Sequence, residues 1–161
     1  MALTPNLGDT YKVSPCITDE TLAHLRQYAK TEAVCFWLGA MNGTSGTVIK
    51  TVWRPKFAAT AVSYDIEPLE MLRLKAYLDE SGLSLVAQVH SHPGVAFHSS
   101  RDDLNAASPW PGFISIVVPN GGRISSDFWI SAEIYELLGG ARWKHLNPVE
   151  KSQRFFLEET Q

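Results

Sequence analysis

Residues 83–103 read LSLVAQVHSHPGVAFHSSRDD. The first seven residues are rich in β-forming side chains and predict a strand that runs into His90. Side chains alternate along a strand, so His90 and His92 face one side and Ser91 faces the other. A Pro-Gly pair then ends the strand, and the loop that follows leads to a predicted helix start at Ser100.

Two imidazoles on one face of a strand, followed eleven residues later by a carboxylate, form a metal-ligand layout. The candidate ligands are His90, His92 and Asp103. Such a set leaves a fourth position for water, as in a catalytic zinc site. Two ordinary interpretations stay open, because short His-x-His matches often bind no metal and Ser100 with Asp103 also resembles a helix capping box.

The complete string resembles the motif of the JAMM, or MPN-plus (JAB), zinc metalloproteases, an upstream Glu followed by H-[ST]-H-P-x6-S-x2-D. The match covers residues 90–93, Ser100 and Asp103 at the spacing of that motif. The resemblance implies that His90, His92 and Asp103 bind one zinc ion and that Ser100 helps to hold the oxyanion.

The same resemblance requires a general base where the first helix gives way to the first core strand. Glu32 opens an apolar run that ends at Gly39 and is the candidate. It would take a proton from the attacking water and give it to the leaving amine, with a pKa raised by partial burial. The alternative is a solvated carboxylate just past a helix end. Glu67 and Glu70 lie in a predicted helix and are poorer candidates.

Composition fits a compact enzyme and excludes several other classes. The chain has 161 residues, of which 45% are hydrophobic and 19% charged, and this predicts a single domain over 1–161 with its core at about 15–147. A net charge of −3 without a basic cluster argues against a nucleic-acid partner. The N-terminus lacks the features of a signal peptide, and no apolar run approaches the roughly 18 residues of a membrane span. We therefore expect a soluble cytoplasmic protein with no membrane partner, in which Cys35 is a small core residue.

Helical and strand patterns alternate along the chain. In order, they predict a helix from Thr18, strands at 33–40 and 47–53 joined by a turn, a helix at 65–81, the strand that enters His90, a short helix at 100–107, a strand at 113–118, a hairpin of 132–138 with 141–146, and a terminal helix at 148–159. The fold class is α/β (α+β), with a mixed, mostly antiparallel curved sheet flanked by helices. This order resembles the JAB/MPN domain, which is cytidine-deaminase-like.

The resemblance implies a zinc-dependent peptidase or isopeptidase that cleaves the amide after the C-terminus of ubiquitin or a ubiquitin-like protein, in deconjugation or precursor maturation. A short, standalone chain is similar to prokaryotic members found beside ubiquitin-like, E1-like and E2-like proteins in antiphage operons. We expect the substrate tail to lie as an extended strand along a sheet edge, near 53–57 or near Phe97 and Trp110. Core packing is the other interpretation of these aromatic residues.

Two other functions and one further residue stay open. The same site could trim a ubiquitin-like sulfur-carrier protein. A non-catalytic MPN scaffold that binds a ubiquitin-like protein is also consistent with the sequence, if the loop at 94–99 or a partner covers the site. His98 could be a spare ligand, but a solvated loop histidine is the simpler interpretation.

Overall fold

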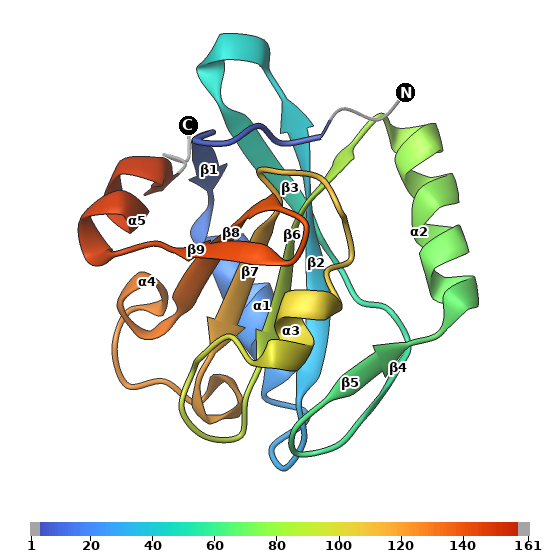
Figure 1. Ribbon diagram of the computed structural model, residues 1–161, viewed down its shortest axis with the longest axis vertical. Helices are drawn as coiled ribbons and strands as arrows, with labels where there is room; N and C mark the ends of the chain where they lie inside the picture. Colours follow the sequence, from blue (N-terminus) through green and yellow to red (C-terminus); the bar gives the residue numbers. More distant parts are fainter. Residues whose placement is uncertain (1–3, 158–161) are drawn as a thin grey trace.

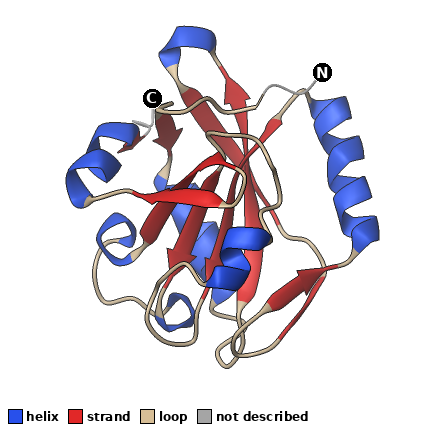
Figure 2. Cartoon of the chain, in the orientation of Figure 1, coloured by secondary structure: helices blue, strands red, loops and turns tan. Residues whose placement is uncertain are grey.

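The structure, a computed structural model, describes residues 4–157 and is built around one curled, mixed sheet (Figure 1). Eight strands lie in the order β10-β1-β3-β2-β6-β7-β8-β9, and a separate pair, β4-β5, stands beside them. Helices cover both faces of the large sheet (Figure 2). The mixed sheet with flanking helices is the predicted fold class.

The elements are β1 (Tyr11–Val13), α1 (Pro15–Leu25), β2 (Ala33–Met41), β3 (Thr47–Trp53), β4 (Phe57–Ala59), β5 (Tyr64–Ile66), α2 (Pro68–Ser81), β6 (Ser84–Ser91), α3 (Ser100–Leu104), β7 (Ile114–Val118), α4 (Phe128–Ser131), β8 (Glu133–Gly139), β9 (Arg142–His145), α5 (Pro148–Arg154) and β10 (Phe155–Leu157). Short 3₁₀ turns lie at Gly43–Ser45 and Asn120–Gly122.

Strand β2 is buried on both faces because it separates two hydrophobic cores. Its alternate side chains Ala33, Cys35 and Trp37 pack into the core that also holds Ile17, Leu22 and Leu25 of α1. The side chains between them, Val34, Phe36 and Leu38, pack with Leu74 of α2. A strand that is covered on both faces has an unbroken run of apolar residues, and this run predicted the strand at 33–40.

Pairing of β2 with β6 sets the geometry of the site. The two strands are antiparallel, with Val34 opposite His90 and Ala33 opposite Ser91. This register brings Glu32, the residue just before β2, beside His92. Beyond β6 the backbone stays fixed, because the His92 amide donates to the Val118 carbonyl at 3.0 Å.

Three helix boundaries differ from the sequence prediction. Helix α1 begins at Pro15 and not at Thr18, since proline is well suited to the first helical turn. Helix α2 begins at Pro68, because Tyr64–Ile66 pair with Phe57–Ala59 as an unpredicted hairpin. Helix α3 ends at Leu104 and not at residue 107.

The C-terminal segment also differs from prediction. The helix expected at 148–159 ends at Arg154, and Phe155–Leu157 form β10, parallel to β1. The Phe155 ring stacks on Tyr11 with ring centroids 5.0 Å apart, so burial of this ring favours the strand. Residues 158 and 159 of the expected helix lie outside the described residues. Within 4–157, no helix combines the length and apolarity needed to cross a membrane.

Candidate metal centre

Strand β6 delivers two imidazoles to the face of the sheet that carries α3. His90 and His92 are buried, and their Nε2 atoms lie 3.3 Å apart. Ser91 faces the other side, where its hydroxyl accepts a hydrogen bond from the Ala33 amide at 3.2 Å. The predicted alternation of these three residues is therefore confirmed.

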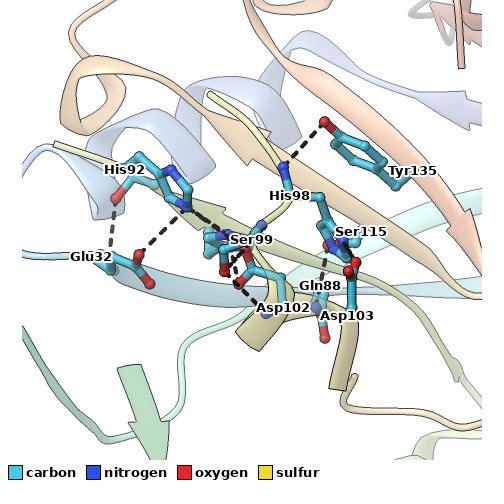
Figure 3. A network of polar contacts seen from close by, with 12 residues as sticks. Glu32, Gln88, His92, His98, Ser99, Asp102, Asp103, Ser115 and Tyr135 are labelled. Atoms are coloured by element: carbon cyan, nitrogen blue, oxygen red, sulfur yellow. Dashed lines mark hydrogen bonds and ion pairs between the residues drawn. The ribbon is translucent and has the colours of Figure 1, made fainter. Parts of the chain in front are cut away.

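Helix α3 adds a buried carboxylate, Asp102, to the two histidines. Its Oδ1 lies 3.3 Å from Nε2 of His90 and its Oδ2 lies 3.8 Å from Nε2 of His92. Ser99, the N-cap of α3, holds Oδ2 through its amide at 2.7 Å and its hydroxyl at 2.8 Å. The capping box between Ser99 and Asp102 thus fixes one carboxylate oxygen (Figure 3). The other oxygen is the one that lies near His90.

These distances fit one small tetrahedral cation. Ligand atoms about 2.0–2.1 Å from a zinc ion at tetrahedral angles lie roughly 3.3 Å from one another. The distances from Nε2 of His90 to Nε2 of His92 and to Oδ1 of Asp102 are both 3.3 Å. Together with Glu32, these residues offer ligand atoms that all lie within 4.8 Å of one another. The donor set of two imidazoles and carboxylate oxygens is compatible with a metal site.

The hydrogen bonds of the histidines favour Nε2 as the ligand atom. Nδ1 of His92 lies 3.2 Å from the Val95 carbonyl, which can only accept, so the proton resides on Nδ1 and the Nε2 lone pair is free. Nδ1 of His90 is buried and has no hydrogen-bond partner within the described part of the chain. Both Nε2 atoms therefore point into the cluster.

Glu32 stands next to this cluster with an unusual proton affinity. Its Oε1 lies 3.5 Å from Nε2 of His92, and the residue is 3% exposed. Burial raises the pKa of Glu32 to about 7, with the charge of His90 opposing the rise and that of Asp102 adding to it. A cation bound beside the carboxylate would lower this pKa again, because it favours the charged form.

The other groups of the cluster are held in the forms that bind metal. The pKa of Asp102 lies below its usual range. Burial would raise it, but the hydrogen bond and charge of His90 and the hydrogen bonds from Ser99 outweigh this effect. Burial, with the charge of His90, lowers the pKa of His92. An ionised carboxylate and a neutral imidazole are the forms that a metal ion requires.

The predicted site is shifted by one residue on α3. Glu32, His90 and His92 come together as expected, but Asp102 takes the place that the sequence motif assigned to Asp103. Ser99 likewise replaces Ser100, which is exposed at the first position of α3. The loop after His92 is one residue shorter than the motif assumed, so the capping box is formed by Ser99 and Asp102.

His98 is neither a spare ligand nor a solvated loop residue. Its side chain is 4% exposed, and its Nδ1 lies 2.7 Å from Oδ1 of Asp103. Its ring stacks between Tyr135 and Trp143, with both ring centroids at 4.6 Å. The aromatic cover could not be read from the sequence, because β8 and β9 lie far along the chain.

A cavity of about 410 Å³ lies next to the cluster. Tyr64 of β5 borders both, since its ring centroid lies 5.4 Å from that of His90. The rest of the lining comes from Asp65 and Ile66 of β5, Met71 of α2, Gln88 of β6, and residues 104–107 at and after the end of α3. On the other side of the cluster, Phe97 is 53% exposed and its ring stands edge-on to His92 at 4.8 Å.

The sequence is similar to those of known peptidases. A model of the family described as prokaryotic homologs of the JAB domain matches residues 16–131. A probable metalloprotease of Sinorhizobium fredii is 34% identical over 129 residues, covering 77% of this chain and 79% of that protein. The desampylase of Haloferax volcanii is 28% identical over 122 residues, covering 74% and 87%. A probable TtuB-protein conjugate cleaving protease of Thermus thermophilus is 36% identical over 117 residues, covering 68% and 76%.

The fold is also found in solved structures. A protein of Desulfitobacterium hafniense superposes with a TM-score of 0.69 at 17% identity, covering 94% of both chains. A protein of Salinibacter ruber superposes with a TM-score of 0.57 at 19% identity, covering 84% of this chain and 88% of that one. At these identities the likeness concerns the fold alone.

Proposed function

The chain belongs to the family of prokaryotic homologs of the JAB domain, and we propose that it is a zinc-dependent peptidase that hydrolyses the amide after the C-terminus of a ubiquitin-like protein. The bond would be an isopeptide bond to a lysine or the peptide bond of a precursor. One observation carries the proposal, the convergence of two Nε2 atoms and the Asp102 carboxylate, at distances of 3.3 to 3.8 Å, beside a buried Glu32.

His90, His92 and Asp102 would hold the zinc ion. When bound there, zinc polarises a carbonyl and lowers the pKa of a water molecule to about 7. Glu32 is placed to accept a proton from that water, because its Oε1 lies 3.5 Å from Nε2 of His92. The same carboxyl would then return the proton to the departing amine.

We assign to Ser99 the oxyanion contact that the sequence motif gave to Ser100. Ser99 is the N-cap next to the cluster, whereas Ser100 is exposed. The single Ser99 hydroxyl proton is donated to Oδ2 of Asp102 in this structure, so it would have to turn to the oxyanion during the reaction while the Ser99 amide keeps its bond to Asp102. A hydroxyl that donates to a developing oxyanion is typically worth about 3 kcal/mol of transition-state stabilisation. Because Ser99 also holds Asp102, its loss would affect both metal binding and the chemical step.

The surroundings of the cluster suit an extended, narrow peptide. The 410 Å³ cavity beside Tyr64 offers mixed apolar and polar walls, and Phe97 projects at the opposite edge. We infer that the substrate tail crosses the cluster between these two features. Trp110 is also exposed, at 57%, and agrees better with a substrate contact than with core packing.

The biological setting is a further part of the proposal. We infer a cytoplasmic enzyme that acts with ubiquitin-like, E1-like and E2-like proteins of a bacterial antiphage operon. The relatives support the substrate class, since one is named a desampylase and another a conjugate cleaving protease.

The test is release of a fluorophore linked by an amide to the C-terminus of ubiquitin and of bacterial ubiquitin-like proteins. We expect zinc-dependent release by the wild type and by the control Ser100→Ala, and none after chelation or in Glu32→Gln. A sulfur-carrier peptidase would instead trim extended carrier proteins and leave conjugates intact. Tight binding of tails without cleavage by the zinc-loaded wild type would overturn the enzymatic proposal in favour of a scaffold.

A further inference from the structure

A continuous chain of hydrogen bonds lies on the side of Asp102 that faces away from His92 (Figure 3). We call it the His98 network, formed by the side chains of Gln88, Ser115, His98 and Asp103. Nε2 of Gln88 lies 3.3 Å from Oγ of Ser115, which lies 3.1 Å from Nε2 of His98. Nδ1 of His98 then lies 2.7 Å from Oδ1 of Asp103.

The end partners and the burial of His98 set the direction of the bonds in the His98 network. Oε1 of Gln88 accepts from the amide of Ala107 at 2.9 Å, so its Nε2 is the donor to Ser115. The Asp103 carboxylate accepts, so Nδ1 of His98 carries a proton. Burial lowers the pKa of His98 and favours the neutral ring, whose Nε2 then accepts from the Ser115 hydroxyl.

Ser115, His98 and Asp103 have the order of a Ser-His-Asp triad, but their environment excludes that function. Ser115 is 0% exposed, and its hydroxyl accepts from Gln88. The His98 ring is covered by Tyr135 and Trp143. No substrate carbonyl can reach this serine, so the His98 network has a structural purpose.

Helix α3 needs such support because it is very short. It has five residues, far fewer than the roughly 12 that a helix needs to be even marginally stable alone. Besides the capping box, the contacts that hold it reach across the sheet. The His98 amide donates to the Tyr135 hydroxyl at 3.2 Å, and Nε1 of Trp143 donates to the Asp103 carbonyl at 3.2 Å. The chain is thus held at His98, two residues before α3 begins, and at Asp103 within the helix.

The two neighbouring aspartates face different ways for a geometric reason. Consecutive residues of a helix point about 100° apart, so one rotation of α3 can direct only one of them at His90. Oδ1 of Asp103 lies 2.7 Å from His98, whereas Oδ1 of Asp102 lies 3.3 Å from His90. The hydrogen bond that holds Asp103 against His98 therefore also holds Asp102 toward His90.

We propose that His98 and Asp103 are positioning residues that set the rotation of α3 and thereby direct Asp102 at the metal. This inference rests on the metal site proposed above. It explains why the repeated Ser-Ser and Asp-Asp of 99–103 produce one defined site, with Ser99 and Asp102 facing the cluster. Neither positioning residue touches the metal or the substrate.

The experiment compares zinc affinity, measured by competition with a chromophoric chelator, in four proteins. Asp103→Leu removes the acceptor for His98, Asp103→Asn keeps an acceptor oxygen in the same place, and Ser100→Ala is an exposed control on the same helix. Supporting groups of metal ligands typically contribute about 10- to 100-fold to metal affinity. We expect a loss of that size in Asp103→Leu, with wild-type affinity in Asp103→Asn and Ser100→Ala.

A second readout in the metal-free protein keeps the inference separate from the proposed function. Amide hydrogen exchange at Asn105, which donates to Arg101 at 3.0 Å, reports the order of α3 directly. We expect faster exchange in Asp103→Leu and unchanged exchange in Asp103→Asn. Equal zinc affinity and equal exchange in wild type and Asp103→Leu would overturn the inference, as would equal losses in both Asp103 variants. Failure of the wild type to bind zinc would overturn the metal site, and the exchange measurement would still decide the role of Asp103.

Discussion

Replacing Glu32 by glutamine should make the metal-free protein more stable and the enzyme inactive. In the folded protein, burial raises the pKa of this carboxyl from 4.5 to about 7. Between these two values the folded chain keeps a proton that the unfolded chain has released. Stability therefore falls as the pH rises through this window, and the whole loss is present above pH 7. Glutamine has nearly the same shape and no charge, so it removes the loss.

The size of the effect follows from the same two values. The difference between 4.5 and about 7, at about 1.36 kcal/mol per pH unit, sets a ceiling of about 3 kcal/mol. Relaxation of the surroundings and water penetration reduce the effective cost of burying a charge, so we expect about 1–2 kcal/mol at pH 8. For a chain of this length that corresponds to a rise in Tm of about 2–8 °C. Loss of a general base should lower kcat by roughly 10²- to 10⁴-fold.

The assay is thermal unfolding in excess chelator at pH 5 and pH 8, with Glu20→Gln as a control for an exposed carboxylate on α1. We expect the gain of Glu32→Gln at pH 8 only, no gain in Glu20→Gln, and a smaller gain once zinc is added. An equal gain at both pH values would show that burial of the Glu32 carboxylate carries no cost and would refute this reasoning.

Three further predictions concern the cap, a core histidine and the exposed aromatic residues. Ser99→Ala should lower the free energy of unfolding by about 1 kcal/mol in denaturant titrations and weaken zinc binding, and unchanged values for both would contradict its role as N-cap. Burial lowers the pKa of His24, so the folded protein releases this proton more readily than the unfolded chain. The contribution of neutral His24 to stability is therefore complete above the unfolded pKa of about 6.5 and is lost as the pH falls below it. In His24→Gln, the stability lost between pH 7.5 and 5.5 should be smaller than in the wild type, and an unchanged pH dependence would contradict the lowered pKa of His24. Phe97→Ala and Trp110→Ala should raise KM for ubiquitin-like substrates at constant zinc affinity, and an unchanged KM would exclude this surface as the tail site.

The sequence predicted those parts of the fold that depend on neighbouring residues. The apolar run of β2 and the strand entering His90 carry their own pattern, and the alternation of His90, Ser91 and His92 follows from strand geometry alone. Glu32 lies beside the histidines, as its position just before an apolar strand led us to expect, because that strand pairs with β6. The pattern of neighbouring residues was therefore enough to bring Glu32, His90 and His92 together.

The choice between neighbouring residues on α3 needed information from distant segments. Ser99 and Ser100 are adjacent, as are Asp102 and Asp103, so either pair could form the capping box. The choice depends on contacts with Ser115, Tyr135 and Trp143, which lie on β7, β8 and β9. A difference of one residue in loop length separates Asp103, which the motif spacing predicted as ligand, from Asp102, which lies in the cluster.

Short strands paired over long distances were missed for a related reason. Strands β1, β4, β5 and β10 have three residues each, too few to show a period. Phe155–Leu157 continued the helical pattern of α5, and only the parallel partner Tyr11 makes them a strand. Tertiary pairing outweighed local propensity at these positions.

The most direct test of the metal centre is anomalous diffraction at the zinc edge from crystals grown with zinc. The account predicts one peak bonded to Nε2 of His90, Nε2 of His92 and a carboxylate oxygen of Asp102, at about 2.0–2.2 Å, with Glu32 facing its open side. Absence of a peak there at saturating zinc, or a peak ligated by Asp103 in place of Asp102, would contradict it.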